Sequence, residues 1–168
     1  MSGDDVFPDR NMSHRDKVEF MLEREGWAID TVAGRADTFP RYSFTIGFED
    51  RFGFPEVCVV GLSPVACRGL FDLVADALAG GTALPVGPPF IGLLDGGQPC
   101  ALLPVDVPGC VDMFPSLAEH HTLAGHARDA FSLVQLAWPD VHGNLPWEPG
   151  FASDLLTVQL LLGEPPTG

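Results

Sequence analysis

Residues 56–79 read EVCVVGLSPVACRGLFDLVADALA, and this stretch predicts a buried strand that leads directly into a helix. Residues 56–62 are nearly all apolar, as in a strand that is covered on both faces. Ser63 and Pro64 form the N-cap and first-turn pair that commonly begins a helix. Apolar residues then recur on one side of the helix, at Ala66, Leu70, Leu73, Val74 and Ala77. Gly80 and Gly81 end the helix, which therefore has one face to bury against a sheet.

Elements on either side of this stretch complete a mixed pattern of helices and strands. Upstream, Ser13 is a candidate N-cap for a helix that Gly26 ends, and strands are predicted at 27–32 and 41–48, with a turn or loop at 49–55. Downstream, short strands are predicted at 90–94, 100–105 and 111–114, a helix at 116–126, a strand at 131–138, a loop at 139–150 and a last helix at 152–162. The Asp95-Gly96-Gly97 turn predicts a hairpin between the first two short strands.

These elements predict an α+β fold. We expect a mostly antiparallel sheet of five to seven strands and two to four helices, with the main helix across one face. The length of 168 residues is close to the commonest size of one domain. We therefore expect a single α+β domain over residues 13–168, preceded by a disordered segment at residues 1–12.

The composition is that of a globular, acidic chain. Hydrophobic residues make up 46% and charged residues 19%, and the net charge is -14. A surface of that sign repels phosphate, which argues against nucleic-acid binding, and it attracts a basic protein partner. No apolar run is long enough to span a membrane and no signal peptide is visible, so we expect a cytoplasmic protein without a membrane role. The four cysteines form no C-x-x-C pair and are expected to be free thiols.

Three groups of residues together resemble the bacterial family known as domain of unknown function 4262. They are GW at 26–27 with YSFTIG at 42–47, RFGFPE at 51–56 with GL at 61–62, and QLAWPD at 135–140 with Gly143 and PWEPG at 146–150. The resemblance spans roughly residues 26–151. Phe54 departs from it, because many relatives have a histidine there. The resemblance supports the limits of the domain and implies no activity.

One segment has the order of a hydrolase nucleophile. Ser63 follows a strand and precedes a helix, as the serine of a nucleophile elbow does. Pro64, however, has no backbone N–H to donate to an oxyanion, and Val65 stands where the elbow needs a glycine. We therefore interpret Ser63 as an N-cap.

Other catalytic and metal-binding patterns are incomplete. Trp138-Pro139-Asp140 is similar to the acid loop of protein tyrosine phosphatases, but no cysteine is followed by an arginine at the spacing of their phosphate loop, so Asp140 is expected to cap a turn. His120, His121 and His126 lack the three- or four-residue spacing of helical metal ligands. No glycine-rich nucleotide loop precedes a helix. We expect no metal and no cofactor, and the role of the three histidines is left open.

Two further groups have both a functional and a structural interpretation. Glu49, Asp50, Arg51 and Glu56 lie near one turn, where paired carboxylates could do acid–base chemistry, but a solvated loop is the simpler interpretation. Tryptophan, proline and phenylalanine side chains gather at 138–151, where they could form either a binding surface or a small core. We expect Trp147 to be the buried anchor of an ordered loop over residues 139–150.

The function that these observations favour is a non-catalytic binding or interaction protein that neutralises a basic protein partner. The alternative is a small cytosolic enzyme of unknown reaction, with a pocket for a small-molecule ligand near the loop between Trp138 and Gly150. The candidate ligand or partner contacts are Tyr42, Glu56, Trp138, Asp140, Trp147 and Glu148. A pocket that brings two of these groups within hydrogen-bond distance would favour the enzyme.

Overall fold

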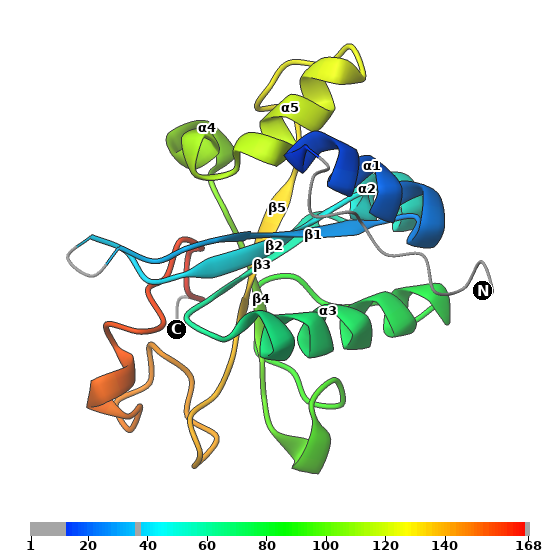
Figure 1. Cartoon of the computed structure of the whole chain (residues 1–168). Helices are drawn as coiled ribbons and strands as arrows, with labels where there is room; N and C mark the ends of the chain where they lie inside the picture. Colours follow the sequence, from blue (N-terminus) through cyan, green and yellow to red (C-terminus); the bar gives the residue numbers. More distant parts are fainter. Residues whose placement is uncertain (1–12, 36–37, 167–168) are drawn as a thin grey trace, which may run out of the picture.

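A five-stranded sheet forms the centre of the protein (Figure 1). The computed structural model describes residues 13–35 and 38–166, so the disorder predicted for residues 1–12 lies outside the described residues. The strands are β1 (Ala28–Val32), β2 (Tyr42–Ile46), β3 (Glu56–Val60), β4 (Ala101–Pro104) and β5 (Leu133–Ala137), in the order β1-β2-β3-β5-β4. Neighbouring strands are antiparallel except β3 and β5, which are parallel. The predicted α+β class and mostly antiparallel sheet are confirmed.

Helices cover both faces of the sheet (Figure 1). Helix α3 (Pro64–Ala79) lies across one face, as predicted, and its Phe71 and Val74 pack with Val57 and Val59 of β3. Helices α1 (His14–Glu25), α4 (Val107–Cys110) and α5 (Pro115–Leu123) lie on the other face, where they bury the alternate residues of the strands. Strand β3 is buried on both sides because it has a helical layer above and below it.

The predicted helix starts are confirmed by their capping bonds. The Ser63 hydroxyl oxygen accepts a hydrogen bond from the backbone N–H of Ala66 at 3.2 Å, and the Ser13 hydroxyl caps α1 through the N–H of Asp16. Gly26, in the left-handed conformation, ends α1. These bonds satisfy helical N–H groups that have no partner within the helix, so Ser63 has the structural role that the sequence predicts.

Four local predictions were wrong. Residues 49–55 are not an open turn, because α2 (Phe48–Phe52) occupies most of them. Residues 90–94 form no strand, and only Phe90 makes an isolated antiparallel bridge, to Cys100 across the predicted turn. The predicted strand at 111–114 is a 3-10 turn (Val111–Met113). In the predicted last helix, only Ser153–Leu155 forms a short 3-10 turn.

Two buried glutamines hold the C-terminal segment in a non-helical conformation. The Gln135 side chain, on β5, donates to the carbonyl of Leu160 and accepts from the N–H groups of Leu162 and Gly163. Gln159 donates to the carbonyl and accepts from the N–H of Trp138. These long-range bonds replace the bonds that a helix would make within itself.

None of the helices in the described ranges has the length and apolar character needed to cross a membrane.

Candidate functional site

Glu56 is a buried carboxylate enclosed by hydrogen-bond donors. It lies at the start of β3 and is 1% exposed. Its Oε1 accepts from the Thr45 hydroxyl at 2.8 Å and from the N–H of Phe48 at 3.0 Å, and its Oε2 accepts from the N–H groups of Gly47 and Glu49 at 3.0 and 3.3 Å. The last three donors begin α2, so Glu56 caps that helix from a neighbouring strand.

A glycine makes this cap possible. Gly47 has a φ of 108°, and a Cβ at that position would come within 2.9 Å of the carbonyl oxygen of Gly26.

Burial raises the pKa of Glu56 to about 7, while the hydrogen bonds from Thr45 and the backbone act in the opposite direction. The predicted solvated loop around Glu56 is therefore wrong, because this carboxylate is inside the protein and organises the chain around it.

Asp140 and Glu148 organise the loop that follows β5. Asp140 is 5% exposed, and its Oδ1 accepts from the N–H groups of His142 and Asn144, both at 2.9 Å. Its Oδ2 accepts from the N–H of Ala152, also at 2.9 Å. Burial raises the pKa of Asp140, but these backbone bonds outweigh it and hold the pKa below its usual value. Glu148 accepts from the N–H of Leu145 at 2.7 Å.

The two tryptophans of this region have different environments. Trp138 is buried, and its indole N–H donates to the carbonyl of Val60 at 2.9 Å. Trp147 is only partly buried, against Ala101, Leu103 and Ala137. Leu145 is 1% exposed, so the buried anchor of the loop is Leu145 rather than Trp147 as predicted. The loop is held by backbone bonds to two carboxylates as much as by apolar contacts.

Tyr42 belongs to the core. It is buried on β2, its hydroxyl donates to the carbonyl of Met113 at 2.6 Å, and its ring lies against those of Phe39, Phe44 and Phe114. Burial, with the nearby charge of Asp30, raises the pKa of Tyr42 to about 12. A phenol with such a pKa is protonated at neutral pH and is a poor general base.

Among the six candidate contact residues, no side chain bonds another. Tyr42, Glu56, Trp138, Asp140 and Glu148 each make hydrogen bonds to elements of the fold, and Trp147 packs on β4 and β5. Two hollows at the surface are lined in part by residues of the β1–β2 hairpin, and their described lining includes no residue from 138–150. The geometry expected of an enzyme site near the loop is therefore not assembled by these residues.

The three histidines lie at the end of α5, next to α2. His120 Nε2 is 3.4 Å from the carboxylate of Asp50, and His121 lies against the rings of His126 and Phe131. The Nδ1 atoms of His120 and His121 are buried, and neither has a hydrogen-bond partner among residues 13–35 and 38–166. Burial lowers the pKa of His121. Within the described part of the chain, no group of three or more His, Cys, Asp or Glu side chains is arranged to hold a metal ion.

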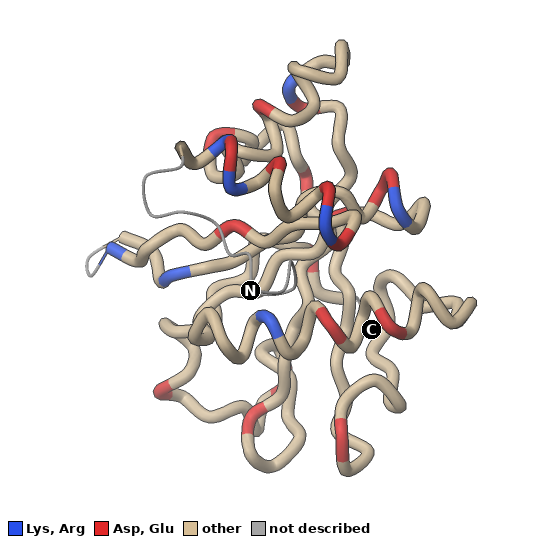
Figure 2. The backbone as a smooth tube through the Cα atoms, turned by 45° about the vertical axis from the view of Figure 1, so that its right-hand side comes forward, with Lys and Arg blue, Asp and Glu red and all other residues tan. Residues whose placement is uncertain are grey.

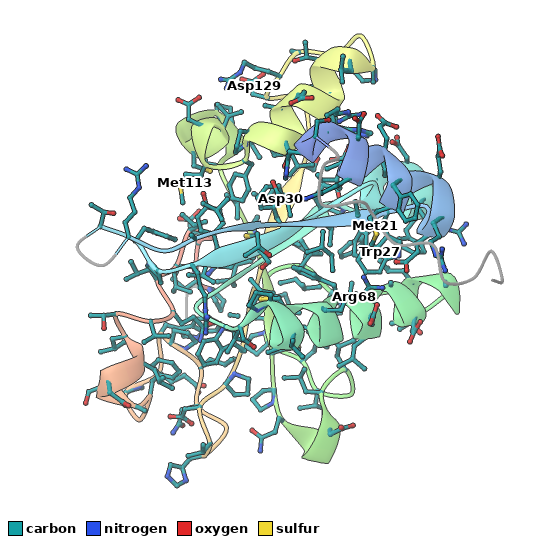
Figure 3. All side chains as sticks on the ribbon, viewed as in Figure 1. Met21, Trp27, Asp30, Arg68, Met113 and Asp129 are labelled. Atoms are coloured by element: carbon teal, nitrogen blue, oxygen red, sulfur yellow. The ribbon has the colours of Figure 1, made fainter. Side chains whose placement is uncertain are left out.

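A second buried carboxylate was missed by the sequence analysis. Asp30, on β1, is 8% exposed and accepts hydrogen bonds from the hydroxyl of Ser116 at 2.5 Å and the N–H of Thr31 at 2.9 Å. His14 Nε2 lies 3.2 Å from the same carboxylate. Asp30 thus ties α1 and α5 to the sheet, as its central place in Figure 3 shows. A single acid within an alternating strand gives no sequence signal of such a role.

The charges of the protein are unevenly distributed, which the sequence analysis also missed. Arg128 is the only Lys or Arg after residue 68, whereas eleven Asp and Glu follow that residue. We call α3 together with segments 80–99 and 139–156 the acidic surface; these parts occupy the lower half of Figure 1. The exposed or partly exposed acidic residues of this surface are Asp72, Asp76, Asp95, Glu148 and Asp154. Arg68 is its one basic residue, and Figure 2 shows that residue as a blue segment on α3.

The positive charge of Arg68 is already paired. Its guanidinium lies 2.9 Å from the carboxylate of Glu25 and 3.3 Å from that of Asp72, and it stacks over the ring of Trp27 at 5.2 Å (Figure 3). It therefore neutralises acids beside it and leaves the rest of the acidic surface uncompensated.

Exposed aliphatic side chains gather on the same surface. Val65 is 83% exposed, Ile91 68% and Val141 87%, and Leu73, Val86 and Leu156 are exposed to a smaller degree. Leu123, at the end of α5, is the one other large hydrophobic residue that is exposed in the described ranges. Aliphatic groups among acidic ones are the composition of a surface that contacts an amphipathic, basic partner.

The chain matches a known protein family over most of its length. The match covers residues 21–152, and the family is described as "Domain of unknown function (DUF4262)". These residues include all five strands, α3 and the loop that Asp140 organises. Phe54, where the resemblance implies a histidine in many relatives, is partly buried against the core on the α3 face. No curated protein matches the chain, and no solved structure matches it.

Proposed function

We propose that this protein, which belongs to the DUF4262 family, is a non-catalytic interaction protein that binds a basic protein partner through its acidic surface. The observation that carries the proposal is the segregation of charge. Every exposed charge on α3 and segments 80–99 and 139–156 is acidic, apart from Arg68, which is paired.

The physical chemistry of this surface suits association. Acidic groups that are not neutralised nearby create a negative potential, which speeds the encounter with a positively charged partner. The exposed side chains of Val65, Ile91 and Val141 add apolar area that would leave water on contact. Charge would therefore guide the partner to the surface, and the aliphatic groups would contribute to holding it there.

The state of the candidate catalytic groups also supports a binding protein. Glu56 and Asp140 accept three or more hydrogen bonds each from the fold, and the hydroxyl of Tyr42 donates to a backbone carbonyl. Groups used in this way hold the chain in place and are not free to exchange protons with a substrate.

The test compares two variants with the same net charge. Asp95→Lys/Asp154→Lys reverses two acids of the acidic surface, and Glu23→Lys/Asp129→Lys reverses two exposed acids elsewhere, on α1 and after α5. Figure 3 shows Asp129 near α5, far above α3. None of the four side chains makes an ion pair or hydrogen bond in the described ranges, so both variants should fold.

The wild type and the two double variants are each immobilised and exposed to extracts of the organism that naturally contains the gene. The proteins that each form captures are then identified. We expect a basic protein to be captured by the wild type and by Glu23→Lys/Asp129→Lys, and to be lost with Asp95→Lys/Asp154→Lys. Equal capture by all three forms would show that the acidic surface is not the binding site. Capture lost equally in both variants would show a dependence on net charge alone.

A further inference from the structure

We infer that the protein also binds a small anionic ligand with an apolar body, in a hollow between the β1–β2 hairpin and the C-terminal segment. The hollow has a volume of about 730 Å³, which is within the usual range of ligand pockets, about 300–1,000 Å³. Arg35 and Arg41 line it from the hairpin side, and Thr157 and Val158 line it from the C-terminal side. This site is separate from the acidic surface and does not depend on the function proposed for it.

The two arginines are the reason to expect an anion. Three other arginines, Arg15, Arg68 and Arg128, lie within ion-pair distance of carboxylates. Arg35 and Arg41 are exposed and form no side-chain hydrogen bond or ion pair with any residue in the described ranges. None of the lining residues that the structure describes is an Asp or a Glu. In a chain with a net charge of -14, two guanidinium groups at one hollow, with no carboxylate partner among the described residues, form a local positive site.

Guanidinium groups select the chemistry of the ligand. Their planar arrangement of N–H donors matches the oxygens of a carboxylate or a phosphate, which they bind with two parallel hydrogen bonds. The hydroxyls of Thr38 and Thr157, also in the lining, can donate to further oxygens. The ligand would therefore carry a carboxylate or phosphate group at the arginine end of the hollow.

The rest of the lining is apolar. Phe39, Pro40, Val158 and Leu160 supply side chains that can cover a hydrocarbon group. A free inorganic anion would leave this part of the hollow unfilled, whereas an alkyl carboxylate or alkyl phosphate would use both parts. The expected ligand is thus an amphiphile with one anionic head.

The fold holds the C-terminal wall of the hollow in place. Gly61 has a φ of 93°, and a Cβ there would come within 2.3 Å of the carbonyl oxygen of Val158, so only glycine allows the segment to lie this close to the end of β3. Gln159, next to Val158, is fixed by its two bonds to the backbone of Trp138. The Gly61 N–H donates to the Arg41 carbonyl at 2.8 Å, which ties the hairpin wall to the end of β3.

The binding test uses four probes that separate the head from the body. Octanoate and octyl phosphate carry both parts, octanol carries only the apolar body, and inorganic phosphate carries only the head. Each is titrated into the full-length protein, and the backbone amide resonances of Gly61, Thr157 and Val158 are followed by NMR. We expect octanoate, octyl phosphate or both to shift these resonances saturably, and octanol and phosphate to bind at least about tenfold more weakly.

Two double variants with equal charge test the arginines. Arg35→Gln/Arg41→Gln should weaken amphiphile binding about tenfold or more, whereas Lys17→Gln/Arg128→Gln should leave it within about twofold. The sequence also has Asp37 between the two arginines, outside the described residues, and Asp37→Asn should bind at least as tightly as the wild type.

Several results would overturn the inference. They are the absence of saturable shifts at millimolar amphiphile, equal binding of octanol and octanoate, and unchanged binding in Arg35→Gln/Arg41→Gln. The inference would also be overturned if Asp37→Asn bound the amphiphiles and the wild type did not. That result would mean that the carboxylate of Asp37 competes with the ligand for the two arginines in the wild type.

Discussion

Two segments of this protein, the start of α2 and the loop after β5, are each organised by one carboxylate, and the two carboxylates differ in the direction of their pKa shift. Glu56 accepts four hydrogen bonds at the start of α2, and burial raises its pKa to about 7. Asp140 accepts three backbone hydrogen bonds in the loop after β5, and these outweigh its burial and lower its pKa. At Glu56 burial outweighs the four donors, whereas at Asp140 the backbone donors outweigh burial.

The largest expected effect is the loss of the buried carboxylate. Glu56→Ala should lower the free energy of unfolding by about 4 kcal/mol, because it leaves buried donors at Thr45, Gly47 and Phe48 without an acceptor and opens a cavity. Denaturant unfolding measures this cost. Glu23→Ala, at an exposed position on α1, is the control and should change stability by less than about 0.5 kcal/mol. A small effect of Glu56→Ala would mean that α2 does not depend on this cap.

The second effect is a pH dependence that separates the two carboxylates. The folded pKa of Glu56 is raised from 4.5 to about 7, so its contribution to stability is fully present below pH 4.5 and is lost as the pH rises through 7. The loss should be about 3 kcal/mol. Unfolding free energies measured from pH 4 to 8 should show this fall, and Glu56→Gln should remove it.

Asp140 should behave in the opposite way. Its folded pKa is lowered, so its contribution is present above its ordinary pKa of 3.8 and is lost as the pH falls through the folded value. Asp140→Asn should therefore flatten the acid side of the same profile and leave the region from pH 4.5 to 7 unchanged. An identical profile in both variants would contradict the contrast between the two loops.

A third, smaller effect is expected from removing the acceptor in the loop after β5. Asp140→Ala should destabilise the protein less than Glu56→Ala does, because water can reach the N–H groups that lose their partner. Asp154→Ala, an exposed position on the following segment, is the matched control. Hydrogen exchange of the amides of His142, Asn144 and Ala152 should accelerate in Asp140→Ala alone. Equal costs for Glu56→Ala and Asp140→Ala would mean that depth of burial does not separate them.

The smallest effect concerns the exposed side of the same loop. Trp147 is partly buried against β4 and β5, so Trp147→Ala should cost about 1–2 kcal/mol rather than the larger cost of a core truncation. Leu145→Ala, at a buried position, should cost about 3 kcal/mol. Thermal or denaturant unfolding of the two variants gives the order directly. The reverse order would restore Trp147 as the anchor.

Local patterns in the sequence predicted the parts of the fold that local interactions determine. Helix α3, its cap at Ser63, and the buried strand before it follow from residues that lie next to one another in the chain. The last segment could not be predicted in this way. Its sequence suits a helix, but Gln135 of β5 bonds its backbone and the side chain of Gln159 bonds the backbone of Trp138. No local pattern records such distant partners.

The candidate residues were identified more reliably than their roles. Tyr42, Glu56, Trp138 and Asp140 were selected as contacts, and all four are buried and hydrogen-bonded within the fold. A polar residue inside an otherwise apolar segment has the same sequence appearance whether it serves the fold or a ligand. The acidic surface depends on how separate segments assemble in space, and the hollow at Arg35 and Arg41 depends on the approach of a segment about 120 residues away in the chain.

The central claim is that function resides on the acidic surface and not at the carboxylates that organise the loops. The most direct measurement is the affinity of the captured, purified basic partner at several salt concentrations, for the wild type, Asp95→Lys/Asp154→Lys and Glu23→Lys/Asp129→Lys. We expect the first double variant to bind at least about tenfold more weakly, with a shallower salt dependence, and the second to keep the wild-type affinity within about threefold. Equal affinity of the two double variants would contradict the account.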